Sequence, residues 1–335
     1  MSCRPFVMSF IAFTFARSSV RAYAPSRLFA PSRVRSLATR SALLAAADPY
    51  AAGQFSLDPD SSEARELTSS MGISSDQHDA LSRLASLVVD WNGRINLVSR
   101  KECSPPIVFG RHVLPSAALS AVPNCALGTA SLAMDVGCGG GFPGLPLAII
   151  YPDTEFWLVD SVGKKLKAVQ DMADELGLEN VRVHHGRVEE LVDDPVDGRK
   201  HRSAYDVCLG RSVTALPRFC FWISDLIKKE EGKLMYIIGG DIDEIVTSQV
   251  EEDCPIDDLL ETAGVSDKRC LVLPASAVKD IARKSGEVKR KVGNKSANKT
   301  KKKRSGSPKG QWKKKENGPK KNRGYDSFER FDSAS

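Results

Sequence analysis

The sequence predicts an α/β fold: a mostly parallel sheet with helices on both faces and a helical extension on its N-terminal side. Two observations support this prediction. Between residues 131 and 275, short aliphatic runs alternate with stretches whose apolar residues have helical spacing. In addition, the glycine-rich stretch GCGGGFPG (137–144) joins the first strand pattern to the first helix pattern of this alternation. Sheets of this kind bind ligands outside the carboxyl ends of their strands.

The predicted elements follow in a regular order. Residues 75–91 form the first helix, with Ser75 or Asp76 as its N-cap, and residues 115–122 form a second, short helix. Strands are then predicted at 131–136, 155–160, 181–185, 205–209, 232–238 and 268–275. Helices are predicted at 143–151, 163–177, 216–228 and 241–250. Because strands alternate with helices, most neighbouring strands should be parallel.

Charge divides the chain into three segments. Residues 1–47 contain seven Arg and no Lys, Asp or Glu. Residues 48–278 carry 21 basic and 36 acidic side chains, a net charge of −15. Residues 279–335 carry 20 basic and 6 acidic side chains, a net charge of +14, and contain few aliphatic residues. We therefore predict a targeting peptide at 1–47, a folded domain at 60–276 and a basic, disordered tail at 279–335.

The N-terminal segment also suggests a compartment. The stretch AYAPSRLFAPSR (22–33) resembles the cleavage context of algal plastids with secondary membranes. We expect the chloroplast, with the mitochondrion as the alternative. The apolar stretch 6–16 is shorter than the roughly 20 residues that span a bilayer. We therefore expect no membrane association after processing. Separately, we expect a monomer. The eight cysteines form no Cys-x-x-Cys pair and have no zinc-ligand spacing, so we expect free thiols and no metal.

The glycine loop is compatible with two cofactors. Gly139, Gly141 and Gly144 formally match the dinucleotide fingerprint, with Asp160 about 20 residues later as the ribose acid. This match by itself would indicate a nicotinamide-dependent oxidoreductase. However, Asp135 precedes the loop, and Asp-x-Gly-x-Gly-x-Gly after a strand resembles the first motif of class I S-adenosylmethionine-dependent methyltransferases. Structural alternatives are a loop-stabilising role for Asp135 and a helix N-cap role for Asp160.

A longer stretch resembles one family. DVGCGGGFPGLPLAIIYPDTEFWLVDSVGKKLKAV (135–169) is similar to the RsmG (GidB) family, including its Phe-Pro-Gly-Leu-Pro-Leu signature. WNGRINLVS (91–99), RHVLPS (111–116), GRVEEL (186–191) and LGRSV (209–213) fall in the family's order. The resemblance covers about residues 63–275. It implies a class I methyltransferase fold and N7-methylation of a guanosine in bacterial-type small-subunit rRNA.

The resemblance also implies site residues. Gly137 and Phe142 match cofactor contacts of the family's glycine loop, and Val188 and Glu189 match the pair that flanks the adenine. Arg211 matches the Arg of the family's Ser-Arg-Ala segment. The expected S-adenosylmethionine contacts are Asp135, Gly137, Gly139, Gly141, Phe142, Asp160, Val188, Glu189 and Arg211. Two positions depart from the family pattern. Pro115 replaces an Asp, and Ile238 replaces the Lys of a Lys-Gly pair.

Contacts with RNA are expected from a second set of side chains. N7 of guanine has no proton to remove, so the reaction needs alignment and electrostatics rather than a general base. We therefore assign no catalytic acid or base; His112 and Arg211 are the candidates for a catalytic role. The expected RNA contacts are Arg111, His112, Asn92, Asn96, Lys164 and Lys165. For the two asparagines, capping a helix or closing a turn is the favoured structural alternative.

The basic tail is the other predicted RNA-binding feature. Residues 279–323 contain 19 basic and 3 acidic side chains, and such segments bind phosphates without reading sequence. The favoured partner is small-subunit rRNA or a ribosomal particle. The alternative function is a non-catalytic ribosome-assembly factor that retains the methyltransferase fold, because Pro115 and Ile238 depart from the family pattern.

Overall fold

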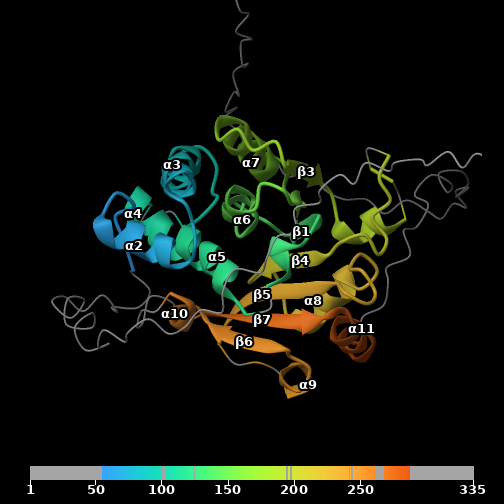
Figure 1. Ribbon diagram of the computed structural model, residues 1–335. Helices are drawn as coiled ribbons and strands as arrows, with labels where there is room; N and C mark the ends of the chain where they lie inside the picture. The colour runs from blue at the N-terminus through green and yellow to red at the C-terminus, as the bar shows by residue number, and fades with distance from the viewer. Residues whose placement is uncertain are drawn as a thin grey trace, which may run out of the picture. The chain divides into compact units, whose positions relative to one another are not determined.

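A computed structural model describes residues 55–99, 103–123, 125–193, 195–196, 198–240, 242, 244–260 and 268–286 (Figure 1). The predicted targeting peptide and the chain from residue 287 onward lie outside these residues. The described part begins before the predicted start at residue 60, and Phe55 and Leu57 are buried in the core. No helix of the described part is long and apolar enough to cross a membrane.

The centre of the described fold is a seven-stranded sheet with the order β3-β2-β1-β4-β5-β7-β6. The strands are β1 (Leu132–Val136), β2 (Glu155–Asp160), β3 (Val181–His185), β4 (Val207–Arg211), β5 (Lys233–Gly239), β6 (Glu252–Pro255) and β7 (Lys268–Pro274). The first five are parallel, β7 is antiparallel to β5, and β6 is antiparallel to β7. The strand order reverses direction between β1 and β4, which is where such sheets bind ligands.

Helices cover both faces of the sheet. They are α2 (Ser62–Ser70), α3 (Ser75–Asn92), α4 (Pro105–Val108), α5 (Leu114–Ala117), α6 (Gly144–Ile150), α7 (Gly163–Glu175), α8 (Leu216–Ile223), α9 (Glu244–Thr247), α10 (Ile256–Leu259) and α11 (Ala275–Lys284). Single turns are the π-helix η1 (Phe109–Val113) and the 3₁₀ turns η2 (Ala118–Ala121), η3 (Ala126–Gly128) and η4 (Val188–Val192). α6 and α7 pack on one face, while α8 and α11 pack together on the other (Figure 1).

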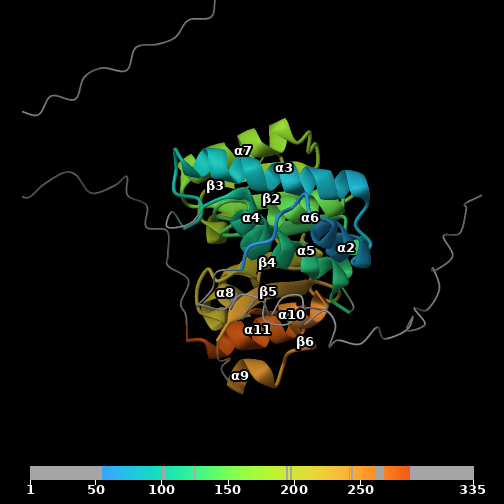
Figure 2. The same cartoon turned by 90° about the vertical axis from the view of Figure 1, so that its left-hand side faces the viewer.

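The N-terminal helices are joined to the sheet domain through α3. A capping box starts this helix: Ser74 accepts the N–H of Gln77, and the Gln77 side chain accepts the N–H of Ser74. The amide nitrogen of Gln77 also donates to the carbonyls of Ile149 and Ile150 at the end of α6, at 3.1 and 2.9 Å. α3 therefore contacts both α6 and α7, and Figure 2 shows it running across them.

The sequence-based assignment was wrong at several elements. The helix expected at 115–122 is the end of a longer helical run that begins at Pro105 and contains the π-turn η1. The helix expected at 241–250 is limited to the single turn α9, and β6 and α10 were not predicted. The tail boundary at 279 falls inside α11, whose Val278 and Ile281 are buried in the core.

Candidate functional site

The loop after β1 lies at the carboxyl edge of the sheet and is shaped by its glycines. Gly137, Gly139 and Gly141 have φ angles of +73°, +57° and +92°. A Cβ on Gly137 would lie 2.7 Å from Cγ1 of Val213, in the loop after β4. Around Gly139, by contrast, the nearest atom to such a Cβ is the Gly137 carbonyl oxygen at 4.0 Å. The loop is packed against protein at Gly137 and open at Gly139, where a ligand can approach the backbone.

Asp135 holds the end of this loop from within β1. Its Oδ2 accepts the N–H of Gly144 at 2.8 Å, and a Cβ on Gly144 would come equally close to that oxygen. Its Oδ1 is buried and has no hydrogen-bond partner among the described residues. Burial, with the nearby Asp160 carboxylate, raises the pKa of Asp135 to about 7, although the Gly144 N–H and Arg211 oppose the shift. Asp135 thus has the predicted loop-stabilising role and keeps one buried oxygen without a protein partner.

Asp160 ends β2 and faces the same loop. Its Oδ2 accepts the N–H of Gly139 at 2.9 Å, and its Oδ1 accepts the N–H of Val162 at 2.8 Å. It does not cap the following helix, because Val162 occupies the N-cap of α7. Each carboxylate oxygen has a second lone pair, so Asp160 can still accept hydrogen bonds from a ligand. Asp160 therefore fixes the loop and remains suited to ribose hydroxyls.

An apolar surface lies beside Asp160. Val162 is 43% exposed, the largest exposure of a large hydrophobic side chain among the described residues. Val188 begins η4 after β3 and is buried, whereas Glu189 is exposed. We did not predict a role for Val162. The sequence does contain a sign of it: Val162 is an aliphatic residue two positions after the aspartate that ends a strand, where a solvent-exposed loop would favour polar residues. Val162 therefore offers an exposed apolar side chain beside Asp160, and Glu189 an exposed carboxylate after β3, whereas Val188 packs in the core.

Arg211, His112 and Phe142 form a cluster across three elements. The Arg211 Nη2, at the end of β4, donates to Nδ1 of His112 at 2.8 Å and to the carbonyl of Arg111 at 3.0 Å. The His112 ring lies 5.3 Å from that of Phe142 in the glycine loop, and the Arg211 guanidinium lies 5.9 Å from the same ring. The structure thus brings together the two candidates for a catalytic role.

Burial and the positive charges nearby keep His112 neutral. Burial contributes most, followed by the positive charges of Arg211, Lys268 and Arg111, and together they lower its pKa to about 3. Burial also lowers the pKa of Arg211 to about 10, against the attraction of Asp135. Arg211 therefore remains the cation of this cluster at neutral pH, and His112 is a neutral imidazole that can donate or accept hydrogen bonds.

Pro115, the first departure from the family pattern, explains how Arg211 is held. Proline has no N–H, so it cannot donate to the carbonyl four residues earlier in the helix, which is that of Arg111. That carbonyl instead accepts Arg211 Nη2 at 3.0 Å. The next carbonyl, of His112, accepts the Ser116 hydroxyl at 2.6 Å and Arg211 Nη1 at 3.4 Å. The proline is therefore compatible with an ordered site.

Ile238, the second departure, lies near the end of β5 and packs against the core on the α8 side. It brings an apolar side chain to this edge of the sheet.

Lys164 and Lys165 lie in the first turn of α7, next to the carboxyl end of β2, with Lys164 exposed. Arg111 is half-buried beside His112. The two lysines lie near the glycine loop, where an RNA contact is possible.

Asn92 does not have the predicted RNA-contacting role. It is buried, and its Oδ1 accepts the backbone N–H groups of Leu97 and Val98 at 2.8 and 3.0 Å. This closes the turn after α3, the structural alternative that we had favoured. A Cβ on Gly140 would lie 3.3 Å from Cβ of Leu97, so the turn rests against the glycine loop. Asn96 is exposed, and its RNA contact stays a prediction.

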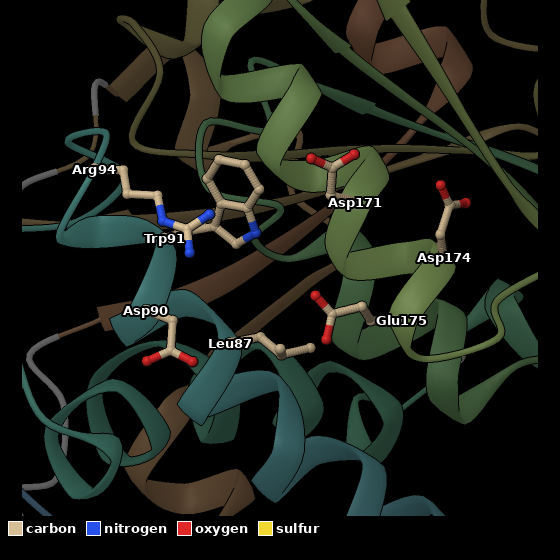
Figure 3. Close-up of a pocket in the computed structure, with 7 residues that line it drawn as sticks. All are labelled: Leu87, Asp90, Trp91, Arg94, Asp171, Asp174 and Glu175. Atoms are coloured by element: carbon tan, nitrogen blue, oxygen red, sulfur yellow. The ribbon is translucent and has the colours of Figure 1, made fainter. Parts of the chain in front are cut away.

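A separate hollow of about 450 Å³ lies between α3 and α7 (Figure 3). It is lined by Leu87, Asp90, Trp91, Arg94, Asp171, Asp174 and Glu175. None of these belongs to the glycine loop or to a strand end, and four are acidic, which disfavours RNA phosphates. Among the described residues, all seven cysteines are free and no group of three or more His, Cys, Asp or Glu is placed to hold a metal ion.

Comparison with known proteins adds a family to this geometry. The family model described as rRNA small subunit methyltransferase G matches residues 77–268. A protein named ribosomal RNA small subunit methyltransferase G from Christiangramia forsetii is 36% identical over 208 residues, 60% of this chain and 92% of the relative. Its namesake from Chlorobaculum tepidum is 42% identical over 170 residues, 51% of this chain and 72% of the relative.

Proposed function

Because the chain belongs to the rRNA small subunit methyltransferase G family, we propose that it methylates N7 of a guanosine in bacterial-type small-subunit rRNA, with S-adenosylmethionine as methyl donor. The observation that carries this proposal is the arrangement of Asp135, the glycine loop and Asp160. All three lie at the carboxyl edge where the strand order reverses, inside the matched residues. The fold is that of a class I methyltransferase, so an oxidoreductase is not favoured.

The residues of this edge fit the cofactor. The open side of Gly139 admits a ligand to the backbone, and Asp160 can accept the ribose hydroxyls. Val162 offers an exposed apolar side chain to the adenine, and Glu189 is exposed as an acceptor. The unpartnered Oδ1 of Asp135 suits the amino-acid part, which carries an ammonium group. The bound cofactor supplies a methyl group on a positively charged sulfur.

The reaction needs no proton transfer. N7 of guanine offers a lone pair and carries no proton, and the bound cofactor would supply the methyl group to that lone pair, with the positive charge passing from its sulfur to the base. The chain must therefore align the reactants rather than remove a proton. A histidine held neutral and an arginine already hydrogen-bonded to backbone carbonyls suit this task, because neither is placed to act as a base.

The compartment and the tail belong to the same proposal. The Arg-rich, acid-free residues 1–47 support import into a plastid, whose ribosomes are of the bacterial type; the mitochondrion is the alternative. The basic residues beyond 286 support added, sequence-independent attraction to rRNA. A fluorescent fusion to residues 1–47 that stays in the cytosol would contradict the import proposal.

Methyl transfer from labelled S-adenosylmethionine to bacterial small-subunit RNA and particles tests the proposed activity. We expect label as N7-methylguanosine at one nucleotide. Asp160→Ala should abolish most of it, whereas Asp153→Ala, an exposed aspartate before the amino end of β2, should not. Cofactor binding without methylation of any RNA or particle would instead favour the assembly-factor alternative.

A further inference from the structure

We propose that His112 selects guanine by donating its Nε2–H to O6 of the target base, and that Arg211 and Pro115 act as positioning residues for it. This inference rests on the proposed function and names how that site recognises its base. It is carried by the hydrogen bonds that link the end of β4 to the π-turn η1.

The tautomer of His112 follows from its partner. An arginine side chain can only donate hydrogen bonds, and Nη2 of Arg211 has two hydrogens. One is directed to the carbonyl of Arg111 at 3.0 Å and the other to Nδ1 of His112 at 2.8 Å. Nδ1 must therefore be the acceptor. Because the ring is neutral, its single proton is on Nε2, and the ring offers a donor there.

Pro115 favours this arrangement. In a regular helix the N–H of residue 115 would bond to the carbonyl of Arg111, and proline has no N–H to place there. Arg211 Nη2 bonds to this carbonyl and to the imidazole of His112. The ring itself is tilted against Phe142 of the glycine loop, at a centroid distance of 5.3 Å. The orientation of the His112 ring is thus fixed by its place in η1, by Arg211 at the end of β4 and by Phe142 of the glycine loop.

The remaining nitrogen is open to a ligand. Nε2 of His112 has no hydrogen-bond partner in the described part of the chain. It is also not among the fully buried polar atoms. It therefore reaches solvent, next to the loop that binds the cofactor. A donor at this position can meet a base whose reacting atom approaches the same loop.

Guanine and adenine differ beside N7. Guanine presents the O6 acceptor there, whereas adenine presents an N6 amino donor. A fixed N–H donor can therefore form a hydrogen bond with O6 of guanine, whereas it faces another donor, the N6 amino group, in adenine. N7 keeps its lone pair for the methyl group in both cases. A neutral donor is also preferable to a cationic one, because the base becomes positively charged as the methyl group is transferred.

The test uses the full chain and small-subunit RNA in which the methylated nucleotide has been replaced. Inosine keeps O6 and lacks the 2-amino group, and 2-aminopurine keeps N7 and lacks O6. Wild-type kcat/KM should be within about threefold for guanosine and inosine, and at least about tenfold lower for 2-aminopurine, as expected when one donor loses its partner.

His112→Leu should lower kcat/KM on guanosine about tenfold and bring the guanosine to 2-aminopurine ratio near one. His112→Gln, which keeps an acceptor for Arg211 and a donor for the base, should restore part of both.

Equal wild-type rates on guanosine and 2-aminopurine, or unchanged discrimination in a folded His112→Leu chain, would overturn the inference while leaving the methyltransferase function intact. A wild-type chain that binds the cofactor and methylates no guanosine would refute the proposed function itself, and the assignment of His112 with it. If His112→Leu does not fold, the wild-type analogue series and His112→Gln still decide between these outcomes.

Discussion

Asp135 is a carboxyl group that the fold moves far from its ordinary protonation state. It is fully buried, and burial raises the pKa of its carboxyl to about 7; Asp160 adds to the rise, while Gly144 N–H and Arg211 reduce it. The folded chain therefore holds a proton between about pH 4 and 7 that the unfolded chain releases. It follows that this group makes the free energy of unfolding fall as the pH rises through that window.

Replacing Asp135 by Asn should remove this pH dependence. Asn keeps an acceptor for the Gly144 N–H and cannot ionise. We expect the free energy of unfolding of the variant, relative to wild type, to increase by about 1.4 kcal/mol per pH unit between roughly pH 4 and 7, then level off. Urea unfolding without cofactor at pH 5, 6, 7 and 8 measures this. A difference that is independent of pH would contradict the raised pKa.

Two asparagines of one segment provide a matched pair. Asn92→Ala removes the acceptor of two backbone N–H groups and loosens Leu97 against Gly140, so we expect a loss of about 1–3 kcal/mol in stability and weaker cofactor binding. Asn96→Ala, at an exposed position, should leave stability within about 0.5 kcal/mol. Denaturant unfolding and calorimetry of cofactor binding compare them. Equal stability losses would contradict the structural role of Asn92.

At the scale of elements, the turn after β4 is held by β5. The Tyr236 hydroxyl donates to the carbonyl of Thr214 at 2.7 Å and accepts the N–H groups of Val213 and Thr214 at 3.2 and 3.4 Å. The turn includes Ser212, whose φ of +49° is unusual for a residue with a side chain. It holds Val213 against Gly137, so Tyr236 positions the glycine loop from the neighbouring strand.

Tyr236→Phe should therefore weaken cofactor binding as well as folding. The variant keeps the ring in the core and loses only the hydroxyl, at a cost of about 1–2 kcal/mol in stability. We expect a KM for S-adenosylmethionine that is raised several-fold. Tyr205→Phe is the control, because its hydroxyl bonds His201 before β4 begins, outside the loops of the carboxyl edge. Steady-state kinetics with both variants measure the difference; an equal KM in the two would contradict a positioning role.

At the scale of the whole molecule, the boundary between fold and tail decides how the tail can be studied. A chain ending at residue 278 loses Ile281 and Ala282, which are buried where α11 packs on α8. We expect it to be destabilised by about 2–5 kcal/mol, as for deletion of a large core side chain, and a chain ending at residue 286 to unfold like the full chain. Thermal unfolding of the two truncations checks this. Identical midpoints would contradict the packing of α11.

The truncation at 286 then isolates the basic segment. The removed residues carry 17 basic and 5 acidic side chains. If they contact rRNA phosphates, the truncated chain should bind RNA more weakly at low salt. The slope of the logarithm of its RNA-binding constant against the logarithm of salt concentration should be shallower by roughly 0.7 for each lost contact with single-stranded RNA. Equal slopes for the full and truncated chains would exclude the segment from RNA binding.

Much of the fold was predictable because its signals are local. β1 (Leu132–Val136) is a continuous buried run, and the glycines, Asp135 and Asp160 follow from short spacings at strand ends. α11 was missed because its buried positions lie where the composition turns Lys-rich, and composition does not show which face of a helix is covered. β6 was missed because an acidic edge strand resembles a loop until its partner β7 is known.

The sequence by itself determined the alternating strands and helices, the glycine loop and the family, because each depends on residues close together in the chain. The tertiary structure alone decided what the side chains do. It turned Asn92 into a turn-closing residue, made Asp160 a partner of Gly139, and paired Arg211 with His112 across about 100 residues of chain. Hydrogen-bond partners, burial and pKa depend on which segments the fold brings together, and no local spacing contains that information.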